Sequence, residues 1–268
     1  MPLRTGDGSR RAVDQSNVET RPSQGFLRRF PETLFTPHPS AIPLIYGHRG
    51  ASADAPENTL EAFALAREQG ADGVELDVRR CIDGDMALHH DAELADGRRI
   101  MDLTRTDLPE ESCTLAAALD VCEGMVVNIE IKNVSVDPDH DPTCALADRV
   151  VALLHERGSR DRVIISSFGL ATVDRIRAID PDVPTALLTF VDPIGPPSIE
   201  LAARHGHQAI HPHVATIDAA YVALAHDHGL AGNVWTVDDP DRMREIASWG
   251  VDGICTNVPA TALAALRS

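Results

Sequence analysis

Two carboxylates lie two residues apart in the apolar segment GVELDV, at Glu75 and Asp77. Alternate residues of a β-strand point to the same face, so both side chains would lie together, with Leu76 opposite. Carboxylates in an apolar strand are costly to bury unless they are paired or bind a cation, and hard cations such as Mg²⁺ and Ca²⁺ prefer oxygen ligands. The pair therefore predicts a divalent metal site. The alternative is an ion pair with Arg79 or Arg80.

A second apolar segment, VVNIEIK, repeats this spacing with Glu130 and Lys132. If it is a strand, it brings a third carboxylate and a cation to one face. Lys132 is the only lysine among the 24 Lys and Arg residues of the chain. Its compact ammonium group suits a single phosphate oxygen, whereas arginine offers a flat fork. The alternative for Lys132 is an internal ion pair with Glu130.

Histidines follow two other apolar runs. His48 and Arg49 precede Gly50, which permits close approach of a ligand or of the backbone. Arg49 can bind a phosphate through its guanidinium fork, and His90 can exchange a proton near neutral pH. His89 points to the opposite face of a regular strand, which favours a structural role. Phosphoryl transfer needs a cation for the phosphate, a base for the nucleophile and an acid for the leaving alcohol, and these residues provide each.

Short β-branched runs alternate with amphipathic stretches from Ile42 onward, which is typical of parallel strands covered by helices. We predict the α/β class, with a single-domain, irregular (β/α)8 TIM barrel. The nine candidate strands are Leu44–His48, Gly73–Val78, Met86–His90, Val126–Ile131, Val163–Ser167, Thr185–Phe190, Ala209–His213, Asn233–Val237 and Val251–Cys255. Only seven residues separate Val78 from Met86, too few for a parallel crossover, so one candidate lies outside the barrel.

Barrel active sites are built at the carboxyl ends of the strands, where residues 48, 49, 75, 77, 90, 130, 132 and 235 would all lie. The clearest helix begins after Asn58, a predicted N-cap, with Glu61 as its capping-box partner and Gly70 as its end. The other predicted helices are Leu115–Cys122, Ala145–Arg157, Leu170–Ile179, Ala219–His228 and Asp241–Trp249.

Composition limits the class of protein. The formal charge of −17 argues against nucleic-acid binding, because phosphate neutralisation needs a basic surface. Five widely spaced cysteines without paired spacing predict free thiols and a cytoplasmic location, and no apolar run predicts an integral membrane segment. Residues 1–39 lack periodicity and predict a mobile N-terminal tail before one domain at residues 40–268. The oligomeric state stays open.

Together the motifs HRG (48–50), PENT (56–59), ELD (75–77), DG (83–84), HD (90–91), EIK (130–132) and WTV (235–237) resemble the glycerophosphodiester phosphodiesterase family in order and spacing, over about residues 45–258. The resemblance implies metal-dependent hydrolysis of a small-molecule glycerophosphodiester to glycerol 3-phosphate and an alcohol, with one divalent ion, Ca²⁺, Mg²⁺ or Mn²⁺. It assigns His48 and His90 as the acid/base pair, Glu75, Asp77 and Glu130 as metal ligands, and Arg49, Lys132 and Trp235 as substrate contacts. The alternative for Trp235 is a core tryptophan.

Several points stay open. Asp238 replaces the asparagine that often follows WTV in the family, which would add negative charge near the glycerol pocket. The 39 residues between His90 and Glu130 are too few for a separate insertion domain, so any cap over the site must be small. Neither the acid and base roles of the two histidines nor the nucleophile, water or the glycerol hydroxyl, is fixed. Alternative functions are head-group cleavage of the lysophospholipase D type, a non-catalytic phosphate-binding barrel, and a lyase or isomerase acting on a phosphorylated metabolite.

The remaining polar clusters are given structural roles. Asp137, Asp139, His140 and Asp141 are bunched between prolines, which is more typical of a solvated loop than of a second metal site. The histidines expected at the surface of helical stretches are His205, His207, His226 and His228. His211 and His213 end a predicted strand and could line the pocket.

Overall fold

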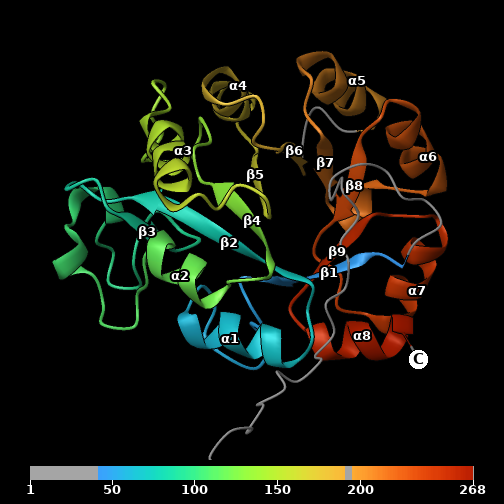
Figure 1. The fold of residues 1–268 in the computed structure, drawn as a ribbon, viewed down its shortest axis with the longest axis horizontal. Helices are drawn as coiled ribbons and strands as arrows, with labels where there is room; N and C mark the ends of the chain where they lie inside the picture. Colours follow the sequence, from blue (N-terminus) through green and yellow to red (C-terminus); the bar gives the residue numbers. More distant parts are fainter. Residues whose placement is uncertain (1–41, 191–194, 268) are drawn as a thin grey trace, which may run out of the picture. The chain divides into compact units, whose positions relative to one another are not determined.

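The computed structural model describes residues 42–190 and 195–267, so the predicted tail at 1–39 and the domain boundary at residue 40 lie outside the described residues. Eight parallel strands form a closed ring, because β1 pairs with both β2 and β9 (Figure 1). The ring strands in order are β1 (Leu44–His48), β2 (Gly73–Arg80), β4 (Val126–Ile131), β5 (Val163–Ser167), β6 (Thr185–Thr189), β7 (Ala209–Pro212), β8 (Ala231–Val234) and β9 (Gly253–Thr256). The predicted (β/α)8 barrel is confirmed.

Helices lie outside the ring of strands (Figure 1). They are α1 (Leu60–Glu68), α2 (Leu115–Val121), α3 (Ala145–Arg157), α4 (Leu170–Ile179), α5 (Pro196–His205), α6 (Ala219–Asp227), α7 (Pro240–Ser248) and α8 (Pro259–Arg267). Short 3-10 turns occupy Ile100–Asp102, Arg105–Asp107 and Val214–Thr216. Helices α5 and α8 are not anticipated from the sequence. Helix α5 begins with two prolines, which the first turn tolerates because its N–H groups have no partner inside the helix.

The ninth strand, β3 (Met86–Leu88), lies outside the barrel, as the short β2–β3 spacing predicts. It pairs antiparallel with β2, because β2 runs beyond the ring and the chain folds back along it, and Ala87 of β3 also forms an isolated bridge with Thr114. The excursion over residues 81–114 then packs on a small apolar cluster of its own, which consists of Cys81, Ala87, Leu94, Ile100 and Leu108. This excursion between β2 and α2 is the short segment that the sequence allows in place of an insertion domain.

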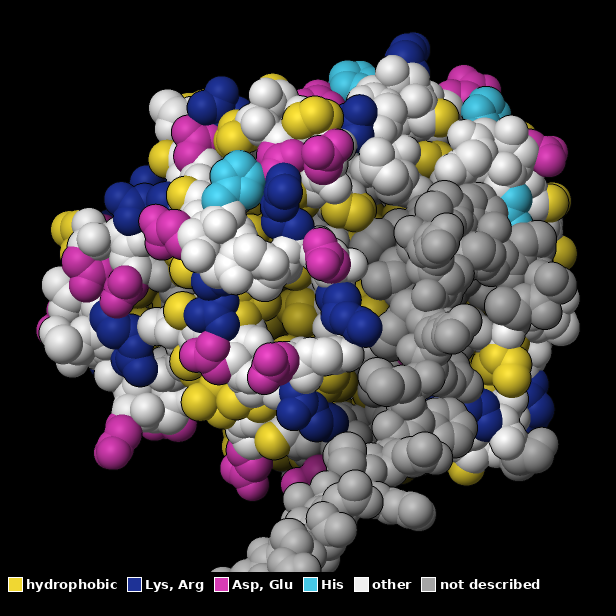
Figure 2. All heavy atoms as spheres, in the orientation of Figure 1, with side chains coloured by type: hydrophobic (Ala, Val, Ile, Leu, Met, Phe, Trp, Pro, Cys, Tyr) yellow, Lys and Arg dark blue, Asp and Glu magenta, His cyan; other side chains and the backbone are white. Residues whose placement is uncertain are grey.

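None of the described helices has the length and apolar character that a membrane crossing requires. All five cysteines fall within the described residues, and each is buried and free. On the face drawn in Figure 2, acidic and basic side chains are interspersed over the described residues. Exposed ion pairs such as Arg175 with Asp148, at 2.7 Å, contribute little stability each.

Gly50 fixes the distance between the end of β1 and helix α1. A Cβ atom there would lie 2.6 Å from the backbone carbon of Ala62, and the Gly50 φ of +89° also disfavours other residues. The close approach that the sequence suggests at Gly50 is therefore made by the helix backbone.

We expect Gly50→Ala to lower the free energy of unfolding by about 2–5 kcal/mol, since it adds overpacking to left-handed strain. Gly97→Ala is the matched control, because Gly97 has a φ of +83° but no atom within 4 Å of the added Cβ. Strain alone should cost about 1–2 kcal/mol there. Urea unfolding measures both variants, and equal losses would contradict the packing explanation.

Candidate active site

The three predicted metal ligands come together at the carboxyl ends of two neighbouring strands. Asp77 on β2 lies directly opposite Glu130 on β4 in the parallel register, and Glu75 lies two residues earlier on the same face. All three carboxylates are buried, and their oxygens lie within 4.8 Å of one another. The period of two in each strand therefore produces one compact acidic cluster.

The sole lysine neutralises part of this cluster. Lys132 Nζ lies 2.7 Å from Glu130 Oε1 and 3.0 Å from Asp77 Oδ1. The internal ion pair that the sequence leaves as an alternative is thus present, within a larger network that also includes Asp77. Burial, the largest influence, lowers the pKa of Lys132, but Glu130 and Asp77 outweigh it and raise that pKa overall. Lys132 is therefore a fixed positive charge in the site.

Arg49 provides the second positive charge. Its backbone takes a φ of +57°, its N–H donates to Glu75 Oε2 at 3.0 Å, and its Nε lies 3.1 Å from Asp77 Oδ2. Its Nη1 donates to both oxygens of Glu57, at 2.9 and 2.8 Å. Arg49 therefore faces the acidic cluster, and its position is fixed by the cluster on one side and by Glu57 on the other.

The alternative in which Arg79 or Arg80 pairs with the acidic pair is wrong. Arg79 forms ion pairs with Asp137 at 3.1 Å and Asp139 at 2.7 Å, and Arg80 lies 3.7 Å from Asp141. The carboxylates of the acidic loop after β4 are therefore paired with arginines, and Asp141 also accepts hydrogen bonds from backbone N–H groups at the start of α3. These contacts favour the structural interpretation of that loop over a second metal site.

Asn58 does not cap α1 as predicted. The N-cap is Thr59, whose hydroxyl accepts from the Ala62 N–H. Asn58 is left-handed, with a φ of +57°, and its amide contacts Asp77 twice: its Nδ2 donates to Asp77 Oδ2 at 2.9 Å, and its Oδ1 accepts from the Asp77 N–H at 3.1 Å. Asn58 therefore positions a candidate metal ligand.

The two carboxylates of β2 have opposite pKa shifts. Burial, the largest influence, raises the pKa of Asp77, but the charges of Lys132 and Arg49 and the Asn58 amide outweigh it and hold that pKa at about 2. Burial, followed by the charges of Asp77 and Glu130, raises the pKa of Glu75 well above its usual range. Three carboxylates therefore face only two cations, Lys132 and Arg49, and the raised pKa of Glu75 reflects this excess of carboxylates.

That excess indicates what the site can bind. A divalent cation prefers several oxygen ligands, and three buried carboxylate oxygens within reach of one point satisfy this preference. Asn128, on the same face of β4, adds an Oδ1 that is buried without a hydrogen-bond partner. The residues present therefore fit a divalent ion held by Glu75, Asp77 and Glu130.

His48 has a defined orientation that follows from its neighbours. Asn257 Nδ2 lies 2.6 Å from Asp238 Oδ2, and a carboxylate only accepts, so the amide nitrogen must face Asp238. The Asn257 Oδ1 then accepts from His48 Nδ1–H at 2.7 Å. His48 Nε2 is left as the acceptor of a neutral ring, 3.9 Å from Glu75 Oε2. Burial, followed by the charge of Arg49, lowers the pKa of His48, which favours this neutral form.

His90 reaches the site by a route that the sequence does not reveal. It follows β3, which is not a barrel strand, so its predicted place at the end of one is wrong. The antiparallel return along β2 instead brings the chain back to the level of Asp77, whose carbonyl accepts from the His89 N–H at 3.1 Å. His90 Nδ1–H donates to Asp91 Oδ1 at 2.7 Å, which leaves Nε2 free.

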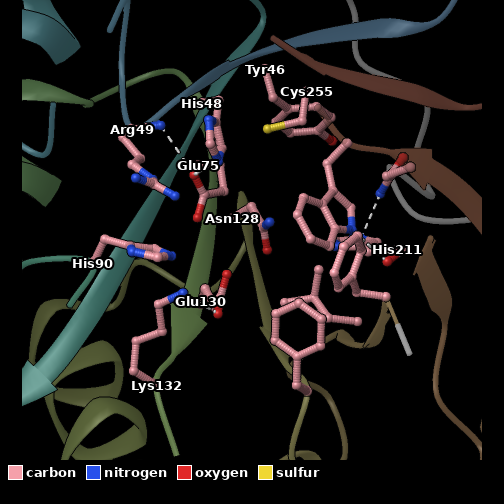
Figure 3. A pocket seen from close by; sticks show the side chains of 15 residues that line it. Tyr46, His48, Arg49, Glu75, His90, Asn128, Glu130, Lys132, His211 and Cys255 are labelled. Carbon is pink, nitrogen blue, oxygen red and sulfur yellow. Dashed lines mark hydrogen bonds and ion pairs between the residues drawn. The ribbon is translucent and has the colours of Figure 1, made fainter. Parts of the chain in front are cut away.

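These side chains line one cavity of about 330 Å³. Figure 3 shows the polar groups His48, Arg49, Glu75, His90, Glu130 and Lys132 on one side, facing Tyr46, His211 and Cys255 on the other. The remaining lining residues are Asn128, Phe168, Leu188, Phe190, Asn233 and Trp235. All the candidate residues except Asp77, which is buried, therefore line the same cavity.

Trp235 belongs to the cavity wall. Its indole N–H donates to the His211 carbonyl at 2.8 Å, and its ring contacts Phe168 at 5.6 Å and His213 at 5.1 Å between centroids. Asp238, which the sequence places near the glycerol pocket, is not among the residues that line the cavity. Its carboxylate instead accepts hydrogen bonds from Thr256 and Asn257.

Sequence reasoning missed several residues of the site. Asn128 could have been found, because it continues the period of two formed by Glu130 and Lys132. Asn257 and Phe168 follow strands without a distinctive neighbour, so only the fold brings them near His48 and Trp235. Among the other histidines, His211 lines the cavity. His207, predicted at the surface, is buried.

A closed barrel whose cavity contains a cation-flanked acidic cluster and two histidines has the groups that hydrolysis of a phosphodiester requires. Residues 48–261 match the profile of the Glycerophosphoryl diester phosphodiesterase family. The chain belongs to this family.

Individual relatives agree with this assignment. The chain is 29% identical over 245 residues to a glycerophosphodiester phosphodiesterase of Caldanaerobacter subterraneus, which covers 84% of this chain and 98% of that one. The glycerophosphodiester phosphodiesterase structure of Thermotoga maritima superimposes with a TM-score of 0.70 at 29% identity, over 81% of this chain and 96% of that one. A phosphodiesterase of Oleispira antarctica, solved with sn-glycerol-3-phosphate, has the same fold with a TM-score of 0.77 at 24% identity, over 85% and 98%.

Proposed function

We propose that the chain hydrolyses glycerophosphodiesters to glycerol 3-phosphate and an alcohol, with a divalent ion held by Glu75, Asp77 and Glu130. The observation that carries the proposal is the placement of His48 and His90 at the cavity that contains these carboxylates and two fixed cations. The structural relative solved with sn-glycerol-3-phosphate supports the choice of substrate.

The bound ion would act as a Lewis acid on a phosphate oxygen. Arg49 and Lys132 neutralise the remaining phosphate charge and orient the phosphorus, because both are held in place by carboxylates before substrate arrives. Preorganised charges of this kind need no rearrangement during the reaction. Trp235 and Phe168 offer an apolar surface to the carbon atoms of the substrate.

The histidines move the protons. His48 Nε2 takes the proton of the attacking hydroxyl as the new P–O bond forms, and His90 Nε2 gives a proton to the alcohol oxygen as the old P–O bond breaks. His48 is assigned as the base because its Nδ1–H is committed to Asn257 and its lowered pKa keeps the ring neutral. The attacking hydroxyl belongs to water or to the glycerol moiety, and a cyclic phosphate seen by phosphorus NMR during turnover would identify the second.

The proposal is tested by measuring the products from a panel of glycerophosphodiesters. We expect glycerol 3-phosphate and free alcohol from glycerophosphocholine, glycerophosphoethanolamine or glycerophosphoglycerol. No release from any of them would contradict it. Phe190 is 50% exposed and lines the cavity together with Phe168 and Leu188, which favours lysophospholipids as a second candidate substrate class. Faster turnover of lysophosphatidylcholine than of glycerophosphocholine would support that alternative.

Asn257→Ala should lower kcat with little change in KM. A hydrogen bond to a charged partner contributes about 1.5–3 kcal/mol, and the Asn257 amide stabilises the His48 ring as it takes up a proton, so kcat should fall roughly 10- to 100-fold. Ser52→Ala is the control, because the Ser52 hydroxyl donates to the same Asn257 oxygen but does not touch His48. Equal kcat values for the two variants would contradict the role of Asn257.

A further inference from the structure

A second group of potential metal ligands lies away from the active site. Among the residues that the structure describes, Asp174, His205 and His207 place one ligand atom each within 4.8 Å of the others. Asp174 belongs to α4, His205 ends α5, and His207 precedes β7. Thr185, which contacts His207, begins β6. The group therefore lies at the amino-terminal ends of the barrel strands, and the active site lies at their carboxyl ends.

His207 is held at its Nδ1 atom. The backbone N–H of Thr185 donates to Gln208 Oε1 at 2.9 Å, which identifies that atom as the amide oxygen. The Thr185 hydroxyl lies 2.9 Å from His207 Nδ1 and 3.3 Å from Gln208 Oε1, and it can donate its single proton to only one of them. When the hydroxyl donates to Gln208, it accepts from His207 Nδ1–H, and His207 Nε2 has a lone pair for an ion.

The other ring nitrogen of His207 has no partner. His207 Nε2 lies 3.4 Å from Asp174 Oδ1 and makes no hydrogen bond, although the His207 side chain is 0% exposed. A buried polar atom without a partner is unfavourable, and an ion between His207 Nε2 and Asp174 Oδ1 would provide one.

The distances suit a small transition-metal ion. A tetrahedral site with bonds of about 2.1 Å has ligand-to-ligand edges of about 3.4 Å, the separation of His207 Nε2 and Asp174 Oδ1. His205 Nδ1 lies 3.0 Å from both Asp174 oxygens, and its proton can move to Nε2 when an ion binds. Asp174 and His205 are 36% and 32% exposed, which leaves an open path for the ion and for a water ligand.

We propose that Asp174, His205 and His207 bind a Zn²⁺-class ion that joins α4 to the α5–β7 junction. Two imidazole ligands select zinc-like ions over Mg²⁺ and Ca²⁺, which prefer oxygen. The guanidinium of Arg177 lies beside Gly206 and repels any dication, so the two imidazole ligands must outweigh that repulsion. The ion is structural, since the site is on the face of the barrel that governs stability.

The test uses the full-length protein after chelation, titrated with Zn²⁺ or Co²⁺. Wild type should bind one more equivalent of metal ion per chain than Asp174→Asn or His205→Ala. It should also develop the visible spectrum of tetrahedral Co²⁺, and its Tm should rise by about 5 °C at saturating Zn²⁺. Both substituted residues are partly exposed, so these variants are expected to fold. Glu75→Gln should keep the spectrum, because it alters only the oxygen-ligand cluster.

The matched control is His155→Ala. His155 Nε2 lies 2.6 Å from Asp180 Oδ2, a histidine–carboxylate pair that is not part of either three-ligand group found among the described residues. Removal of the His155 side chain should leave the additional equivalent of bound metal ion, the Co²⁺ spectrum and the Zn²⁺-induced rise in Tm unchanged. Equal stoichiometry in wild type and Asp174→Asn, or a Tm shift that survives in Asp174→Asn and His205→Ala, would overturn the proposal.

Discussion

His48→Ala is expected to lower kcat for glycerophosphodiester hydrolysis by about 10²- to 10⁴-fold, the usual contribution of a positioned general base. The loss should fall on kcat because the phosphate is held by Arg49, Lys132 and the metal site, which the substitution leaves intact. Steady-state release of glycerol 3-phosphate at saturating metal measures it. His89→Ala is the control, since His89 does not line the cavity. A His48→Ala variant with near wild-type kcat would remove the base from the mechanism.

A leaving group that needs no proton separates the two histidine roles. His90→Ala should be as impaired as His48→Ala on glycerophosphocholine, whose leaving alkoxide requires an acid. On a nitrophenyl ester of glycerol phosphate, His90→Ala should recover most of its turnover, whereas His48→Ala should not. The reverse pattern would exchange the assignments of acid and base.

Lys132→Ala is expected to lower the free energy of unfolding by about 3–5 kcal/mol, because it leaves Asp77 and Glu130 buried with their closest cation removed. Hydrolysis should be lost as well. Lys132→Arg keeps the charge and should recover much of the stability. It should recover little activity, since a planar guanidinium cannot occupy the same point between two carboxylates.

Urea unfolding and the hydrolysis assay together measure these changes. Arg80→Ala is a suitable control, because Arg80 is 32% exposed and lies 3.7 Å from Asp141 in a single ion pair. It should cost no more than about 1 kcal/mol. If Lys132→Ala were no more destabilising than Arg80→Ala, the network between β2 and β4 would not be the buried charge cluster described.

The barrel follows from the alternation of apolar runs with amphipathic stretches, and much of its site follows from one physical rule, the period of two along a strand. That rule places Glu75 with Asp77 and Glu130 with Lys132, and parallel pairing of β2 and β4 then brings the two pairs together. The rule failed at His90, because β3 returns antiparallel along an extended β2 and its pairing depends on a contact that no local pattern encodes.

The amides around the site were harder to predict. Asn58 is a strong capping residue by type, yet its side chain holds Asp77, and the neighbouring Thr59 takes over the cap. Asn257 lies 209 residues from His48 along the chain, so only closure of the barrel between β9 and β1 brings the two together. Polar groups whose partners lie on distant strands cannot be assigned from spacing alone.

The most direct test of the proposed function is release of glycerol 3-phosphate from glycerophosphocholine by protein that has been chelated and then resupplied with Ca²⁺, Mg²⁺ or Mn²⁺. Chelated wild type should show no turnover, and at least one ion should restore it. Glu75→Gln should require far more of that ion or fail to respond, because one of three carboxylate ligands is lost. Turnover that is unchanged by chelation, or equally restored in Glu75→Gln, would contradict the metal-dependent mechanism.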